Sequence, residues 1–424
     1  MNESDSERIL YILEKEGYNR TYSIEESDII VINTCTVREN AKNKLYGHIG
    51  NLKKIKEKKE DILICIGGCA AQELKGKIID DFPYVDIVFG TYNITELPEL
   101  INKRISSGKS VCSIKKSGFD TDLLNVKRSY SYKAFVPIII GCNNNCSYCI
   151  VPRVRGKERS IEPEKIIDYV KNLVSRGVIE VTLLGQNVNS YGKSPDKYCS
   201  FSELLDRVSD IKGLERLRFM TSNPMDFSND IIYMIRDKKN IANHIHLPFQ
   251  SGSNRILKDM RRKYTREDYL GIIDKINKEI PECLVTTDII VGFPGEERKD
   301  FLKTLDVVEK SRFNRSFTFI YSPRNGTLAA KMDDYIPHSE KKNWFNELVY
   351  IQNNISYEEN KKFIGREFKV LVEGISVKDS RMLSGRMENN IIVNFKGSKN
   401  LAGKMVNVKI TGARTFYLTG EAVI

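Results

Sequence analysis

Three cysteines within eight residues are the first candidates for chemistry in this sequence. Cys142, Cys146 and Cys149 form a C-x3-C-x2-C motif directly after the apolar segment AFVPIII, which predicts a strand. A structural zinc ion takes four ligands, and no nearby cysteine or histidine supplies a fourth. A four-iron cluster held by three thiolates keeps one iron open for another ligand. The motif therefore indicates a three-thiolate iron–sulfur site rather than a zinc site or three incidental core cysteines.

The composition is typical of a soluble globular chain with more than one domain. The chain has 424 residues, of which 41% are apolar and 29% are charged. No segment approaches the run of about 18 apolar residues that a membrane span needs. The acidic start, MNESDSERIL, resembles neither a signal peptide nor a transit peptide. We therefore expect a cytoplasmic protein with no membrane partner, whose nine cysteines serve metal binding or catalysis more than disulfides.

Alternating strand and helix patterns divide the chain into three predicted domains of α/β and β type. Residues 1–115 carry strand segments between helices, which predicts a small parallel α/β domain, and residues 116–132 form a polar linker. Residues 133–356 contain six strand segments separated mostly by helical patterns, which predicts an open (βα)6 partial TIM-type barrel with its chemistry at the carboxyl ends of the strands. Residues 357–424 have short alternating strands, which are typical of a small antiparallel β-barrel.

Positive charge is concentrated near the C-terminus and after the cysteine motif. The net charge is +11, and residues 361–424 hold 12 Lys and Arg against 5 Asp and Glu, a balance of +7. A small basic barrel is typical of modules that bind structured or single-stranded RNA. Four cations that follow the cysteine motif suit a polyphosphate substrate, with a solvated charged loop as the alternative. These cations are Arg153, Arg155, Lys157 and Arg159.

Motifs along essentially the whole chain resemble one enzyme family. The cysteine motif, with Tyr148 before its last cysteine, resembles that of the radical S-adenosylmethionine enzymes. NTCTVREN around Cys35 and GGCAAQ around Cys69 resemble the N-terminal domain of the methylthiotransferases in that superfamily. The barrel segments LLGQNVNSYG, HLPFQSGSNRIL and DIIVGFPGE, and the final LAGKMVNVKITGARTFYLTGE of a TRAM domain, resemble the same family. The motifs are nearest to the branch that modifies N6-isopentenyladenosine in tRNA.

The resemblance implies two 4Fe-4S clusters and S-adenosylmethionine as cofactors. The three cysteines of the first motif would hold the cluster that cleaves S-adenosylmethionine, and the resulting radical would attack carbon 2 of the adenine next to the anticodon. Cys35 and Cys69 would hold a second cluster, whose third cysteine lies in a GCQMN motif on an opening strand in the family. The sequence starts at MNESD. We therefore expect that strand and that thiolate to be missing, through a misplaced start or a truncation, and the second cluster to be weak or absent.

Polar and glycine residues at the predicted strand ends complete the predicted cofactor site. By the resemblance, Gln186 and Asn187 contact the methionine amino group, and Gln250 and Ser251 contact the ribose or carboxylate; an ordinary turn is the alternative for each pair. The glycines of GFPGE allow close backbone approach to a ligand such as adenine. Arg324 in YSPRNGT joins the predicted substrate contacts. The predicted cofactor contacts are Tyr148, Gln186, Asn187, Gln250, Ser251, Gly292 and Gly295.

The resemblance also implies partners and leaves alternatives. The expected partners are the tRNA anticodon arm, a low-potential electron donor such as flavodoxin or ferredoxin, and a sulfur donor or cluster carrier. One alternative is the same chemistry on threonylcarbamoyladenosine in tRNA or on an aspartate of a ribosomal protein. Another is an iron–sulfur protein that binds RNA without turnover. The balance of +7 in residues 361–424 favours RNA over the ribosomal protein.

Overall fold

The computed structural model describes residues 1–35, 39–118, 123–193 and 195–423. Residues 36–38 of the NTCTVREN motif and 119–122 of the predicted linker lie outside the described residues, and the predicted domain boundaries remain predictions. The chain forms two compact units. The first comprises Met1–Ser129, Phe135–Asn145 and Cys149–Ile161, and the second comprises Tyr130–Ala134, Cys146–Tyr148 and Glu162–Ile424. No helix in the described part combines the length and hydropathy needed to cross a membrane.

A parallel sheet with the order β1-β2-β3-β4 forms the centre of the first unit. Its strands are β1 (Ile29–Thr34), β2 (Leu63–Gly68), β3 (Ile87–Phe89) and β4 (Val111–Ser113). The helices around it are α1 (Asn2–Lys15), α2 (Glu39–Lys58), α3 (Cys69–Leu74), α4 (Lys77–Asp81) and α5 (Leu97–Ser107). The predicted parallel α/β domain is therefore confirmed, including its start on a helix. The three-residue strand β4 was not predicted.

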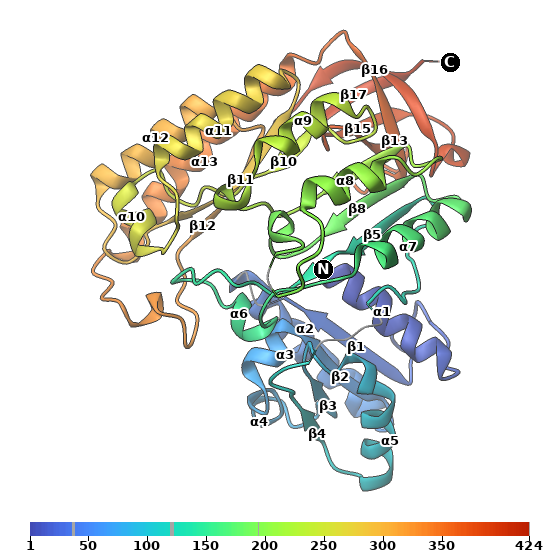
Figure 1. The fold of residues 1–424 in the computed structure, drawn as a ribbon. Coiled ribbons are helices and arrows are strands. Elements are labelled where there is room, and N and C mark those ends of the chain that lie inside the picture. Colours follow the sequence, from blue (N-terminus) through green and yellow to red (C-terminus); the bar gives the residue numbers. More distant parts are fainter. Residues whose placement is uncertain (36–38, 119–122, 194, 424) are drawn as a thin grey trace. The chain divides into compact units, whose positions relative to one another are not determined.

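Alternate residues of β2 face two different layers of helices. Leu63 and Cys65 pack with residues of α1 and α5, whereas Ile64 and Ile66 pack with residues of α2, α3 and α4. This alternation follows from the period of two in a strand. Because both faces are covered, all six residues of β2 are buried. The first unit is thus a three-layer α/β/α arrangement (Figure 1), and the carboxyl ends of β1 and β2 lead into Cys35 and Cys69.

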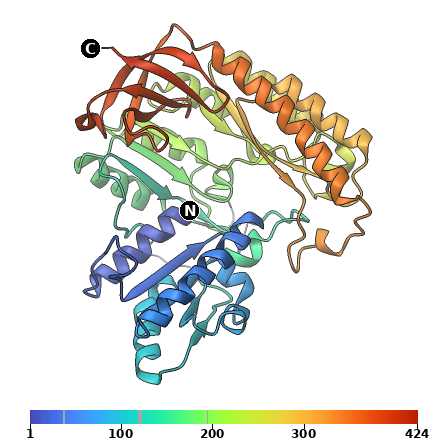
Figure 2. The same cartoon turned by 180° about the vertical axis from the view of Figure 1, so that it is seen from behind.

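The six predicted barrel strands are all present. They form two three-stranded sheets with the orders β5-β8-β9 and β10-β11-β12, and Leu217 on β9 pairs with Ile241 just before β10. Helices α12 and α13 lie side by side in both views of the ribbon (Figures 1 and 2). The strands are β5 (Lys133–Pro137), β8 (Glu180–Leu184), β9 (Arg216–Phe219), β10 (His244–His246), β11 (Leu284–Val291) and β12 (Arg315–Ile320). The helices are α7 (Pro163–Ser175), α8 (Phe201–Ser209), α9 (Asn229–Asp237), α10 (Asn254–Asp259), α11 (Arg266–Glu279), α12 (Arg298–Ser311) and α13 (His338–Lys361).

Five strands close into a small barrel at the C-terminal end, with the order β13-β14-β15-β17-β16. Its core contains Val370, Val393, Phe395 and Leu418, all with no exposed surface. The predicted small barrel is confirmed, and one strand pair differs from a purely antiparallel pattern. Strands β15 and β17 pair in parallel. Between them the chain runs back along β16, which is antiparallel to β17, so β15 and β17 point in the same direction. The strands are β13 (Glu367–Ile375), β14 (Leu383–Met387), β15 (Ile392–Lys396), β16 (Met405–Ala413) and β17 (Tyr417–Ala422).

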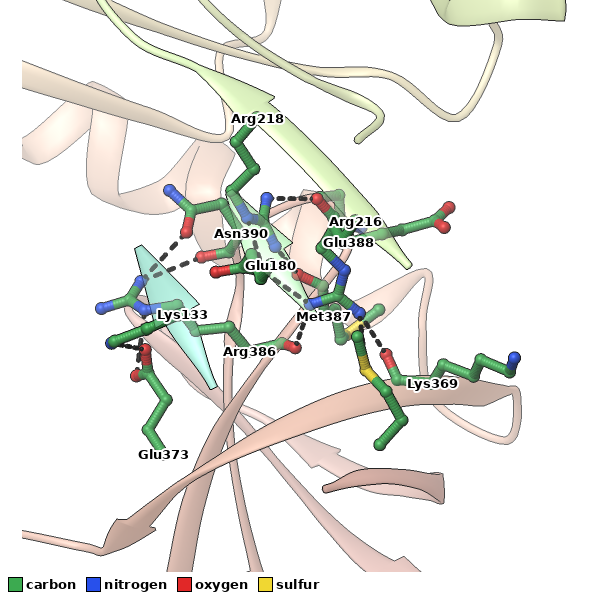
Figure 3. Close-up of polar contacts among 12 residues, drawn as sticks. Lys133, Glu180, Arg216, Arg218, Lys369, Glu373, Arg386, Met387, Glu388 and Asn390 are labelled. Atoms are coloured by element: carbon green, nitrogen blue, oxygen red, sulfur yellow. Dashed lines mark hydrogen bonds and ion pairs between the residues drawn. The ribbon is translucent and has the colours of Figure 1, made fainter. Parts of the chain in front are cut away.

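A buried group of charges fastens this small barrel to strands β8 and β9 (Figure 3). Arg216 Nη1 and Arg218 Nε donate to the same oxygen of Glu180, at 3.2 and 3.0 Å. Four further guanidinium hydrogen bonds go to backbone carbonyls of the small barrel. The acceptors are the carbonyl oxygens of Lys369, Arg386, Met387 and Glu388. Since Glu180 and Arg216 are the first residues of their strands, the small barrel covers the amino ends of β8 and β9, away from the carboxyl ends where barrel enzymes carry their chemistry.

Candidate active site

The first unit brings Cys35 and Cys69 together. Strands β1 and β2 are parallel neighbours with Thr34 opposite Gly68, so the next residue of each strand emerges at the same sheet edge. Gly68 has a φ of +90°, and a Cβ there would lie 2.4 Å from Asn33 Oδ1, so this turn requires glycine. The hydrogen bond between the two thiols and the burial of the site raise the pKa of Cys69, whereas the Arg155 charge lowers it.

Arg155 lies inside this site. Its Nε–H donates to Cys69 Sγ at 3.1 Å, and its other end pairs with Asp5. The Arg155 side chain is 7% exposed, so its charge is already engaged within the protein. We predicted a substrate contact for Arg155 from its place in a basic segment. A contact partner 86 residues away in the chain has no local sequence signal. The contact places Arg155 beside Cys69, and its substrate role stays a prediction.

The donor set of this site contains two thiols in the described residues. No group of three His, Cys, Asp or Glu side chains in the described part of the chain is arranged to hold a metal ion. Two thiolates are fewer than the three that the family resemblance implies for a cluster here, so these residues alone do not fit such a group. We therefore derive no reaction step through this site.

The cysteine motif follows a tight turn after β6 (Ile139–Ile140), which pairs with β7 (Arg159–Ser160) in the first unit. A Cβ on Gly141, whose φ is +79°, would lie 2.2 Å from the Lys157 carbonyl oxygen. The Cys142 N–H donates to the Gly156 carbonyl at 3.0 Å. These contacts hold the backbone at residues 156–157 close to the backbone at residues 141–142. The exposed cations that follow the cysteine motif in the sequence therefore lie near Cys142 in space.

The side chains of all three cysteines of the motif are half-buried. Cys142 and Cys149 belong to the first unit, and Cys146 belongs to the second. In the second unit, Arg262 Nη1 lies 3.5 Å from Cys146 Sγ. This contact is a hydrogen bond from a charged donor to the sulfur. By number and chemistry, three thiols match the protein ligands of a 4Fe-4S cluster that keeps one iron open. The described residues do not show the three sulfurs gathered around one point, so the match rests on the donor set and not on its geometry.

The carboxyl ends of β8 and β9 carry polar atoms without partners. Among the described residues, Asn187 Oδ1, Asn189 Nδ2 and Ser222 Oγ are buried and have no hydrogen-bond partner. Thr221, a β-branched residue, has a φ of +72°, which costs on the order of 1–3 kcal/mol. Unsatisfied polar atoms and backbone strain at one barrel rim are features of a site built for a polar ligand. The sequence pointed to Asn187 and Gln186, but Asn189, Thr221 and Ser222 were missed, because only the folded rim shows their orientation.

The next strand ends complete the rim. Gln250 has a φ of +68°, and β11 holds it there: its N–H donates to the Asp288 carbonyl, and its carbonyl accepts from Ile290 N–H, both at 3.0 Å. Ser251 is buried beside it. A Cβ on Gly292 would lie 2.6 Å from the Lys341 side chain, so this glycine is needed for packing as well as for any ligand approach.

The remaining predicted residues lie as follows. Gly295 has a φ of +79° and is exposed, and its nearest neighbour, Arg255, is 4.0 Å from an ideal Cβ. Tyr148 packs beside an apolar cluster that includes Met260 and Phe293 in the second unit. Arg324 is half-buried after β12. The predicted substrate cations with exposed side chains are Arg153, Lys157 and Arg159.

Glu296 is a rim residue that the sequence did not single out. Its Oε2 accepts from the backbone N–H groups of Gly292 at 2.6 Å and Phe293 at 3.2 Å, which fixes the GFPGE turn. The side chain is buried, and this burial raises its pKa from 4.5 to about 7, although the two N–H donors lower it. The carboxyl group is therefore partly protonated near neutral pH.

The raised pKa of Glu296 predicts that the free energy of unfolding depends on pH, and Glu296→Gln should remove this dependence. Because the folded pKa exceeds the unfolded one, the contribution of Glu296 is fully present below its ordinary pKa of 4.5 and is lost as pH rises through about 7. The shift corresponds to roughly 3 kcal/mol at 1.36 kcal/mol per pH unit. Denaturant unfolding from about pH 5 to about pH 8 should show this decline in the parent chain and a flatter profile in Glu296→Gln. The exposed Glu215→Gln is the control; equal slopes in parent and Glu296→Gln would contradict the prediction.

Three family models match successive parts of the chain. The Radical SAM superfamily matches residues 136–308, Uncharacterized protein family UPF0004 matches residues 1–90, and the TRAM domain matches residues 361–423. A tRNA-2-methylthio-N(6)-dimethylallyladenosine synthase from Clostridium novyi (strain NT) is 48% identical over 427 residues, which cover 100% of this chain and 94% of the relative. The enzyme of that name from Clostridium beijerinckii is 49% identical over 424 residues, which cover 99% of this chain and 93% of the relative.

A solved structure shows the same fold. The radical S-adenosylmethionine methyltransferase TsrM from Kitasatospora setae matches with a TM-score of 0.58 at 15% identity, over 78% of this chain and 74% of TsrM. The fold, the thiol motif and the matched superfamily define a radical S-adenosylmethionine enzyme, with 4Fe-4S clusters and S-adenosylmethionine as cofactors. More narrowly, the chain belongs to the family of tRNA-2-methylthio-N(6)-dimethylallyladenosine synthases, and is a methylthiotransferase with a C-terminal TRAM domain.

Proposed function

We propose that this chain adds a methylthio group to carbon 2 of N6-dimethylallyladenosine (N6-isopentenyladenosine) next to the anticodon of tRNA. The observation that carries the proposal is the identity of 48–49%, over nearly the full length of both chains, to relatives named for this product. The TRAM domain and its balance of +7 support RNA as the partner, because a basic surface attracts the phosphate backbone.

Cys142, Cys146 and Cys149 would hold the cluster that binds S-adenosylmethionine. When bound, such a cluster would supply the electron for reductive cleavage of S-adenosylmethionine, which is the chemistry needed to remove hydrogen from an unactivated carbon such as carbon 2 of the adenine. The chain itself orients the cofactor. Asn187 Oδ1, a buried acceptor without a partner in the described residues, would accept a hydrogen bond from the ammonium group of the cofactor. Ser222 Oγ, on the neighbouring strand end, offers a hydroxyl to the same ligand.

Basic side chains outside the three cysteines would hold the RNA through its phosphates. Arg153, Lys157 and Arg159 have exposed side chains and follow the cysteine motif, so they would contact phosphates beside the modified adenosine. Such contacts fix the position of the RNA without reading its sequence. The TRAM domain would hold the rest of the anticodon arm.

The reaction needs partners that the chain does not supply. A low-potential electron donor such as flavodoxin or ferredoxin would reduce the radical-site cluster, and a separate sulfur donor or cluster carrier would replace the sulfur that leaves with each product.

The proposed tRNA substrate also indicates the cellular compartment. Because tRNA is used in translation, we propose that the protein acts in the cytoplasm.

Two tRNA anticodon arms that differ only in the modified adenosine test the substrate assignment. One carries N6-isopentenyladenosine and the other carries N6-threonylcarbamoyladenosine. After anaerobic incubation with dithionite, sulfide and S-adenosylmethionine, mass spectrometry of the nucleosides should show methylthiolation of the first RNA. Preference for the second RNA, or for a ribosomal-protein peptide, would overturn the substrate while leaving the enzyme class intact.

A further inference from the structure

Arg262 is held in one orientation beside Cys146. Its Nη1 lies 3.5 Å from Cys146 Sγ, its Nη2 donates to the Pro248 carbonyl at 3.2 Å, and its Nε donates to Tyr264 Oη at 2.9 Å. Each of the three guanidinium nitrogens therefore has a partner. Because the planar guanidinium group is bound at all three nitrogens, it has little freedom to rotate. The contact between Arg262 Nη1 and Cys146 Sγ is therefore fixed by the surrounding residues.

The loop that carries Cys146 is fastened to the same turn as Arg262. The Ser147 N–H donates to the Met260 carbonyl at 3.1 Å, and Ser147 Oγ donates to the Asp259 carbonyl at 2.7 Å. The Ser147 carbonyl accepts from Ala329 N–H at 2.8 Å. Because Asp259 ends α10 and Met260 follows it, donor and sulfur are positioned by one short segment.

The charge of Arg262 lacks an acidic partner. No carboxylate in the described part of the chain forms an ion pair with Arg262; its partners are a carbonyl, a phenol and the sulfur. The side chain is half-buried, and taking a cation out of water without a counter-charge is costly. A thiolate at Cys146, bound to a cluster that gains negative charge on reduction, would supply that counter-charge.

We propose that Arg262 is a positioning residue of the radical-site cluster, whose N–H···S hydrogen bond to Cys146 raises the reduction potential of that cluster. The inference rests on the proposed ligand role of the three cysteines. Hydrogen bonds to cluster sulfurs are among the factors that set the potential, because they stabilise the more negative, reduced state. Without Arg262 the same electron donor would reduce a smaller fraction of the clusters, and cleavage of S-adenosylmethionine would slow accordingly.

The test is the midpoint potential of the cluster, measured by redox titration with electron paramagnetic resonance. All variants are made in the full chain with Cys69→Ala, so that only the radical-site cluster titrates, and iron content is measured first. Arg262→Met should lower the potential enough to change the reduction equilibrium about tenfold, which is about 59 mV for one electron. Arg262→Lys, which keeps charge and N–H donors, should recover part of the shift. Arg261→Met removes an exposed cation one residue away and should leave the potential unchanged.

The outcomes separate this inference from the ligand assignment. An unchanged potential in Arg262→Met at full iron content would overturn the inference. If Arg262→Met does not load iron, Arg262→Leu, which also lacks the charge and the N–H donors, takes its place in the titration, and a potential equal to that of the parent would overturn the inference. Retention of about four irons in Cys146→Ala would overturn the ligand assignment instead, because a cubane holds four irons.

Discussion

Cys146→Ala is expected to abolish the release of 5′-deoxyadenosine while leaving tRNA binding nearly unchanged. Two thiolates would remain at the motif, and a cubane with one open iron needs three protein thiolates. RNA binding depends on other features: the exposed cations Arg153, Lys157 and Arg159 and the basic residues of the TRAM domain. The measurement is anaerobic turnover with dithionite and S-adenosylmethionine beside a tRNA binding titration.

Cys112→Ala is the matched control for this prediction. Cys112 is an exposed cysteine on β4 and has no place in the proposed chemistry, so its removal should change neither measurement. Equal loss of turnover and RNA binding in Cys146→Ala would mean that the motif is structural. Unchanged turnover would mean that Cys146 is not a ligand.

Glu180→Ala should cost about 3–5 kcal/mol in the free energy of unfolding, because it leaves two arginines buried without a counter-charge. Glu180, Arg216 and Arg218 are 5%, 4% and 6% exposed. Despite burial, which raises it, the pKa of Glu180 is lowered overall by Arg218 and Arg216, so its carboxylate stays ionised at neutral pH. The contribution is therefore present above the ordinary pKa of 4.5 and lost as pH falls through the lower folded value.

An exposed ion pair and a triple variant test whether the cost of Glu180→Ala comes from burial of the charges. Glu164 accepts two hydrogen bonds from Arg207 at 2.7 Å, but the side chains are 62% and 40% exposed, so Glu164→Ala should leave the free energy of unfolding nearly unchanged. Replacing all three buried charges with Leu and Met should recover much of the loss, since no charge is then left unpaired. Equal costs for Glu180→Ala and Glu164→Ala in denaturant unfolding would contradict the proposed role of burial.

Local patterns were sufficient for most of the helices and strands, and the family resemblance singled out Cys35 and Cys69. The apolar segments predicted all six barrel strands, because each is a largely apolar run that ends in a polar or glycine turn. The pairing of Cys35 with Cys69 follows from two parallel strands that end at one edge of a sheet. By contrast, β4 escaped prediction because its residues, Val-Cys-Ser, lie in a polar segment and form no apolar run.

Side-chain partners that are far apart in the chain could not be predicted from one sequence. Arg155 and Asp5 are 150 residues apart, and Arg262 and Cys146 are 116 residues apart. A basic segment indicates charge, but it does not tell which cation turns inward. Thus Arg155 was assigned to the substrate with its exposed neighbours, and Arg262 was not singled out at all. The strain at Thr221 is likewise a property of the folded rim, and its sequence, TSNP, resembles an ordinary turn.

The most direct test of the central claim uses tRNA whose isopentenyladenosine carries deuterium at carbon 2. A radical that removes this hydrogen must carry the deuterium into 5′-deoxyadenosine, while the RNA gains a methylthio group at the same carbon. We predict deuterated 5′-deoxyadenosine together with the 2-methylthio nucleoside, both detected by mass spectrometry. Methylthiolation with deuterium-free 5′-deoxyadenosine, or cleavage of S-adenosylmethionine with an unmodified RNA, would contradict the account.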